Sequence, residues 1–156
     1  MTATDLALIA ALIVDDDAMI AWGVEGILRE VGLRNIVVAG SSTSARVAAE
    51  RETFGLLVCD LNLGPFSANG CEVLAAIDPF EKIPTIIHTA YSSSEVAATI
   101  AKSRPAALVV HKPATSVQIR QAVHASLELP DSGRDGTDTL SLRHDKPISA
   151  VAKKTA

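Results

Sequence analysis

Residues 10–17 read AALIVDDD, a short apolar run that stops abruptly at three aspartates. Five consecutive apolar residues suit a strand buried on both faces of a parallel sheet, with charge where the chain emerges at the sheet edge. The period then changes, because apolar side chains at 20, 24, 27 and 31 recur at helical spacing before Gly32. This stretch predicts a strand over 10–14 followed by a helix over 18–31.

The same alternation of apolar run and helical period repeats along the chain. Further strands are predicted at 35–39, 56–59, 85–88 and 107–110. The helices between and after them are expected from Ser42 or Thr43 to 51, over 70–77, from one of Ser92, Ser93 or Ser94 to about 103, and from about 117 until Pro130 ends the last. Five strands alternating with five helices predict an α/β fold, in which helices cover both faces of a doubly wound parallel sheet.

Length and composition favour one globular domain, because 156 residues with 48% hydrophobic side chains bury one core. A net charge of −4 argues against binding to nucleic acid or anionic membranes. The chain shows neither a signal peptide nor an apolar run of membrane-spanning length, which predicts a cytoplasmic protein. Cys59 and Cys71 form no CxxC motif and are expected to be buried thiols. The ordered domain is predicted over 1–130, and the polar segment 131–156 is predicted to be a disordered tail.

Polar residues stand where the predicted strands end. Asp15, Asp16 and Asp17 follow the first strand, Asp60 the third, Thr89 the fourth and Lys112 the fifth. The carboxyl ends of parallel strands meet at one edge, which is where doubly wound folds place their sites. Clustered carboxylates attract a hard cation such as Mg²⁺, a carboxylate can be phosphorylated, and Thr and Lys can contact phosphoryl oxygens. Alternatively, any one of these residues could merely solvate the edge.

These residues, in this order, resemble the receiver domain of bacterial two-component response regulators over about residues 8–128. The resemblance implies a flavodoxin-like five-stranded sheet in the order 2-1-3-4-5 and a phosphoacceptor at Asp60. It also implies that Thr89 and Lys112 contact the phosphoryl group. Mg²⁺ would be held by Asp16, by Asp15 largely through water, by Asp60 and by the backbone carbonyl of Asn62. The chain would then be no enzyme toward other substrates and would catalyse only its own Mg²⁺-dependent phosphorylation and dephosphorylation.

Three departures from the family pattern concern the loop after Asp60 and the switch residues. Gly64 stands where the family usually has Pro, and Gly70 comes later than usual, so this loop is longer. The usual aromatic switch residue, three before Lys112, is Val109. Tyr91 could instead cover the phosphoryl site and slow attack by water, or be an ordinary half-exposed loop tyrosine.

Other aromatic and histidine side chains near this edge allow two interpretations each. Trp22 lies off the apolar stripe of its helix and either anchors a partner or packs with partial burial. His88 and His111 precede site residues and either make a switch sensitive to pH or are satisfied strand histidines.

Partners follow from the resemblance: a histidine kinase or histidine phosphotransfer protein would supply the phosphoryl group. Output would pass to a downstream protein target or a phosphorelay, and the protein is expected to be a monomer or weak dimer. A DNA-binding output is not expected, since the polar segment 131–156 could not bury the core of such a module.

The sequence leaves two rival functions open. Asp15-Asp16-Asp17 contains the D-x-D of haloacid-dehalogenase-like phosphatases, with Asp15 as nucleophile and Mg²⁺ as cofactor. That interpretation leaves Asp60 unexplained and lacks a later acidic pair at a strand end. A binding module that works without phosphorylation is the other alternative.

Overall fold

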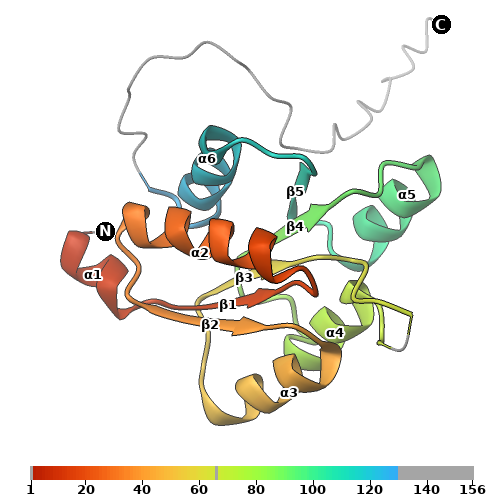
Figure 1. The fold of residues 1–156 in the computed structure, drawn as a ribbon, viewed down its shortest axis with the longest axis horizontal. Coiled ribbons are helices and arrows are strands. Elements are labelled where there is room, and N and C mark those ends of the chain that lie inside the picture. Colours follow the sequence, from red (N-terminus) through yellow and green to blue (C-terminus); the bar gives the residue numbers. More distant parts are fainter. Residues whose placement is uncertain (1, 66, 130–156) are drawn as a thin grey trace, which may run out of the picture.

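The computed structural model describes residues 2–65 and 67–129, and its centre is a single parallel sheet. The five strands lie in the order β2-β1-β3-β4-β5, which confirms the predicted doubly wound fold (Figure 1). The strands are β1 (Ala10–Val14), β2 (Asn35–Ala39), β3 (Leu56–Cys59), β4 (Thr85–Thr89) and β5 (Leu108–His111). The order reverses between β1 and β3, so the carboxyl ends of these two strands flank the crevice in which such folds place ligands.

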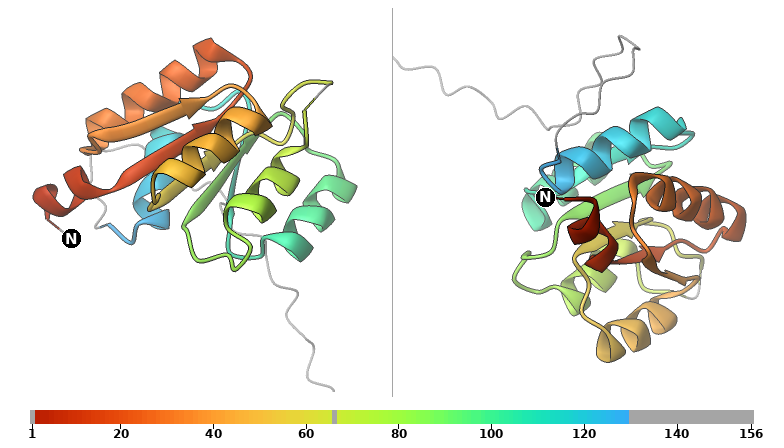
Figure 2. Two further views of the ribbon diagram at one scale, coloured as in Figure 1. Left: turned by 90° about the horizontal axis from the view of Figure 1, so that it is seen from below. Right: turned by 90° about the vertical axis from the view of Figure 1, so that its left-hand side faces the viewer.

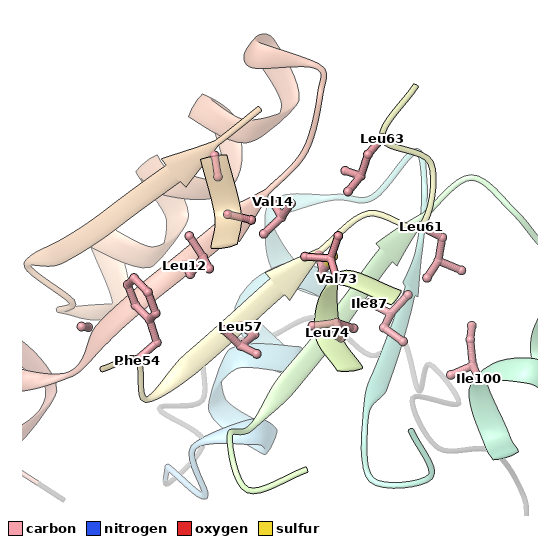
Figure 3. Packing of buried hydrophobic residues seen from close by; sticks show 14 residues of the cluster. Leu12, Val14, Phe54, Leu57, Leu61, Leu63, Val73, Leu74, Ile87 and Ile100 are labelled. Atoms are coloured by element: carbon pink, nitrogen blue, oxygen red, sulfur yellow. The ribbon is translucent and has the colours of Figure 1, made fainter. Parts of the chain in front are cut away.

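Helices cover both faces of this sheet. One face carries α2 (Ala18–Val31) and α6 (Ser116–Ser126), and the other carries α3 (Ser42–Arg51), α4 (Gly70–Ile77) and α5 (Ser94–Ser103) (Figures 1 and 2). Along β1, Leu12 and Val14 pack beneath α3 and α4, whereas Ala11 and Ile13 pack beneath α2. Because alternate side chains enter different cores, both sets must be apolar. This explains why the central strands β1 and β3, which are buried along their whole length, are continuous apolar runs; Figure 3 shows the core on the α3–α5 face.

The described residues contain six helices, one more than predicted. The additional helix, α1 (Ala3–Leu8), precedes β1 and begins with a capping box, in which Thr2 Oγ1 accepts from Asp5 N and Asp5 Oδ2 accepts from Thr2 N. Leu6 packs against the core on the α2/α6 face. A helix this short has no apolar periodicity, so local capping and one tertiary contact determine it rather than a repeating pattern.

The remaining boundaries differ little from those predicted. The cap of α3 is Ser41 rather than Ser42 or Thr43, because Ser41 and Ser44 form a reciprocal capping box. The cap of α5 is Ser93, one of the three serines proposed. No helix among the described residues is long and apolar enough to cross a bilayer. The predicted tail, 131–156, lies outside the described residues.

Candidate functional site

The ladder hydrogen bonds of the sheet fix the backbone of each predicted site residue. Asp15 N donates to Ala39 O at 3.1 Å, and Asp60 N donates to Val14 O at 2.8 Å. Lys112 N donates to Thr89 O, also at 2.8 Å. Asp15, Asp60 and Lys112 are therefore the first residues after β1, β3 and β5, and their backbone amides continue the hydrogen-bond ladder of the sheet. This continuity places Asp15, Asp60, Thr89 and Lys112 at one edge, as predicted.

Lys112 joins two of the carboxylates. Its Nζ lies 2.7 Å from Asp15 Oδ2 and 2.7 Å from Asp60 Oδ2, and the relative exposure of Asp15 and Asp60 is 4% and 7%. Burial raises the pKa of Asp15 above its ordinary value, against the opposing effect of the hydrogen bond from Lys112. For Lys112 burial alone would lower the pKa, but its hydrogen bonds to Asp15 and Asp60 outweigh burial and raise it. The ammonium group is thus held in its charged form.

A third carboxylate completes the cluster. Asp15, Asp16 and Asp60 each offer a carboxylate oxygen within 4.8 Å of the others, and Asp16 is exposed. Asp17 has a different role, because its Oδ1 caps α2 by accepting from Met19 N and Ile20 N. The structure thus separates the three consecutive aspartates, leaving two for the site and one for the helix.

The donor set fits a hard divalent cation. All the ligand atoms of the cluster are carboxylate oxygens, which Mg²⁺ prefers, and three carboxylates against one lysine leave an excess of negative charge. Asn62 N donates to Asp60 Oδ1 at 3.1 Å, and Asn62 Oδ1 accepts from Gly64 N at 3.2 Å. These bonds fix the loop residue whose carbonyl is the predicted fourth ligand.

Thr89 and its neighbours occupy the other side of the edge. Thr89 is fully buried, and its Oγ1 accepts from Tyr91 N at 3.1 Å, so the hydroxyl hydrogen stays available for a further acceptor. Tyr91 is 48% exposed. Val109, on β5, is partly buried against the core of the α3–α5 face. Val109 therefore has no aromatic ring that could act as the switch residue. The aromatic side chain that lies close in sequence to Thr89 is Tyr91.

Two glycines support the site in ways that sequence reasoning missed. A Cβ on Gly70 would lie 2.1 Å from Asp60 O, so the start of α4 can approach the acceptor only because this residue has no side chain. Gly64 has φ +90°, and a Cβ there would lie 3.6 Å from Asp16 Oδ2. A glycine at the first position of a predicted helix was the available signal for Gly70.

His88 is a buried polar group that does not fit the interpretation of a satisfied strand histidine. Its exposure is 5%, and Nε2 has no hydrogen-bond partner among the described residues. Burial, assisted by the charge of Lys112, lowers the pKa of His88 to about 4. His88 is therefore held neutral and is not a satisfied strand histidine.

The remaining predicted residues have these environments. Trp22 is 61% exposed on α2, so its side chain is accessible to solvent while a smaller part of its surface is covered by the protein. Cys59 is a buried free thiol, as expected, whereas Cys71 is a free thiol that is only partly buried; burial raises the pKa of both.

Comparison with known proteins agrees with this geometry. Residues 11–124 match the family model described as "Response regulator receiver domain". The transcriptional regulatory protein ZraR of Klebsiella oxytoca is 33% identical over 93 residues, which are 59% of this chain and 20% of that protein. The chain thus spans about a fifth of the length of this curated relative.

Solved structures show the same architecture. The receiver domain of the PhyR response regulator from Erythrobacter litoralis is 25% identical with a TM-score of 0.67, covering 82% of this chain and 96% of that one. A CheY-like receiver domain protein from Methanospirillum hungatei is also 25% identical, with a TM-score of 0.69 and coverage of 78% and 94%. With the family match over most of its length, the fold and the edge cluster, the chain belongs to the response regulator receiver domain family.

Proposed function

We propose that this chain is a phosphorylation switch in which the Asp60 carboxylate accepts a phosphoryl group from the phosphohistidine of a kinase or phosphotransfer protein. The observation that carries the proposal is the contact of Lys112 Nζ with both Asp15 and Asp60 at 2.7 Å. A carboxylate oxygen of Asp60 attacks phosphorus, the phosphorus–nitrogen bond breaks, and the leaving imidazole takes up a proton. Asp60 is held for this step by Lys112 and by Asn62 N.

Mg²⁺ is proposed to be held by Asp16, Asp60 and the Asn62 carbonyl, with Asp15 largely through water. When bound, the cation neutralises charge on the transferring phosphoryl oxygens. Lys112 supplies a fixed positive charge to one phosphoryl oxygen, and the Thr89 hydroxyl donates to another. Phosphoryl transfer depends mainly on such positioning and neutralisation, so these side chains suffice without a separate acid or base.

Output is proposed to be phosphorylation-dependent binding to another protein or passage of phosphate along a relay. Two observations support this: the family match is to a receiver domain, and the exposed Asp16 brings the acidic cluster to the protein surface. We place the protein in the cytoplasm, where phosphohistidine donors of this family act, and propose that it has no activity on substrates other than its own acyl phosphate.

The test is intact mass after incubation with Mg²⁺ and a small phosphodonor such as acetyl phosphate. The wild type is expected to gain one phosphoryl group, and Asp60→Asn none. Asp17→Asn is the matched control, because it makes the same change two residues from Asp15 but keeps an oxygen to cap α2. Equal labelling of Asp60→Asn, or failure of the wild type to label, would refute the proposal.

A further inference from the structure

The loop between β3 and α4 is held by a succession of hydrogen bonds that starts at the phosphoacceptor. Asn62 N donates to Asp60 Oδ1, Gly64 N donates to Asn62 Oδ1, and Ser67 N donates to Gly64 O at 3.3 Å. Each bond begins at the residue where the previous one ends. These bonds lead from the Asp60 carboxylate through Asn62 and Gly64 to Ser67.

Ser67 joins this series to another helix. Its Oγ accepts from Ser42 N at 3.1 Å and donates to Ser42 Oγ at 2.8 Å. Ser42 is the first residue of α3, and the first amides of a helix have no partner within the helix. The capping serine, Ser41, bonds to Ser44 N and leaves Ser42 N for Ser67. The loop thus supplies a helix cap from 25 residues away in sequence.

The inner part of the same loop lies between the core and the acidic cluster. Leu61 and Leu63 are buried in the core of the α3–α5 face (Figure 3). On the other side, Gly64 approaches Asp16 Oδ2 closely enough that an added Cβ would be in van der Waals contact. Residues 60–64 are therefore held from one side by the core, and from the other side by the bond of Gly64 O to Ser67, which is itself attached to Ser42.

We propose that Ser67 is a positioning residue for the cation site, since its contact with Ser42 holds Asn62 and Gly64 in place beside Asp16 and Asp60. This inference rests on the proposed function, because it concerns the Mg²⁺ that Asp60 requires. Without the Ser67 hydroxyl, the Ser42 amide lacks its partner, and Ser67 and the Gly64 carbonyl bonded to it are no longer attached to α3. The Asn62 carbonyl then has to be ordered again each time a cation binds.

The experiment compares Mg²⁺ affinity, amide exchange and phosphorylation in the full chain. In Ser67→Ala the Kd for Mg²⁺, measured by calorimetry, should rise about 2- to 10-fold, the factor expected for one hydrogen bond. The phosphorylation rate at saturating Mg²⁺ should stay within about twofold of wild type, because the groups that touch phosphate are unchanged. In metal-free protein the amides of Ser42 and Gly64 should exchange faster. Ser67→Thr, which keeps the hydroxyl, should restore the Kd for Mg²⁺ and the slow exchange of the Ser42 and Gly64 amides.

Ser44→Ala is the control, because it weakens the capping of α3 without touching the loop. It should lower thermal stability and leave the Kd unchanged. If the wild type binds Mg²⁺ and Ser67→Ala has the same Kd, the role of Ser67 is refuted while the proposed function stands. The same conclusion follows if Ser44→Ala raises the Kd as much as Ser67→Ala does. If the wild type itself binds no Mg²⁺, the proposed function fails and the role of Ser67 fails with it.

Discussion

Among the described residues, buried carboxylates meet a basic side chain at two places, one at each end of the sheet. At the carboxyl ends of the strands, Lys112 faces Asp15 and Asp60, with Asp16 close by. At the other end, Asp78 follows α4 and Arg104 follows α5, just before β4 and β5 begin. Both clusters combine carboxylates with a basic side chain, and their difference shows what separates a functional charge cluster from a structural one.

The Asp78–Arg104 cluster is matched within the protein. Arg104 donates to Asp78 Oδ2 at 3.2 Å, to Asp78 O at 2.6 Å and to Leu74 O. The remaining capacity of the Asp78 carboxylate is taken by Lys82 N and Ile83 N, each at 3.0 Å. One acid faces one base, and the pair ties the end of α4 to the end of α5. The edge cluster instead has three acids for one base, which leaves charge for an external cation to neutralise.

The largest expected effect is on stability at the matched pair. Arg104→Met should lower the free energy of unfolding by about 3–5 kcal/mol, because Asp78 would remain buried without a cation. Urea denaturation measures this change. Arg29→Met, which breaks an exposed pair with Glu25, is the control and should cost less than about 1 kcal/mol. Similar losses in the two variants would mean that the Asp78–Arg104 pair is not a structural tie.

A pH titration tests the uncharged group beside the edge cluster. His88 has a pKa of about 4 in the folded protein, below its ordinary value of 6.5. Between pH 6.5 and pH 4 the unfolded state therefore binds more protons at His88 than the folded state does. The contribution of His88 to the free energy of unfolding is fully present above pH 6.5 and is lost as the pH falls toward 4. Between pH 7 and pH 5 the wild type should lose about 2 kcal/mol more than His88→Leu. Equal losses in urea denaturation would show that His88 is not held neutral by burial.

Stabilisation by Mg²⁺ should depend on the carboxylates beside Lys112 and not on the Asp78–Arg104 pair. At ten times its Kd, Mg²⁺ should stabilise the wild type by about 1.4 kcal/mol, since it binds only the folded state. The same increment is expected in Asp78→Asn, whereas Asp16→Asn should lose most of it. Thermal unfolding with and without Mg²⁺ measures these differences. Equal stabilisation of Asp16→Asn would indicate binding elsewhere.

The smallest expected effect is that of Asp60→Asn on stability. Neutralising one of three carboxylates relieves repulsion and keeps a polar group for Lys112, so the free energy of unfolding should change by less than about 1 kcal/mol. The same change at Asp78 leaves Arg104 unpaired and should cost about 3 kcal/mol. Chemical denaturation of the two variants gives both values. A large loss in Asp60→Asn would make the edge cluster structural as well.

Most of the fold follows from local patterns. The central strands β1 and β3 are continuous apolar runs because both their faces are buried, and the site residues stand at the carboxyl ends of the strands. Asp60 and Lys112 could therefore be placed at one edge without coordinates. α1 could not be predicted in this way, because a capping box and one packed leucine determine it.

What could not be predicted depends on contacts between residues far apart in sequence. Arg104 is 26 residues from Asp78, and a basic residue at a helix end usually faces solvent. The bond between Ser67 and Ser42 likewise requires that the loop return to α3. The close approach of Gly70 to Asp60 O is visible only once α4 is placed on the sheet.

The central claim is that the unmatched edge cluster carries a phosphoryl group on Asp60. The most direct measurement is reduction of phosphodonor-treated protein with borohydride, which converts an aspartyl phosphate to homoserine, followed by peptide mapping. The account predicts homoserine at position 60 and unmodified aspartate at positions 15, 16 and 78. Homoserine at position 15 would contradict it and favour the phosphatase alternative, and no homoserine at any position would refute phosphorylation of a carboxylate.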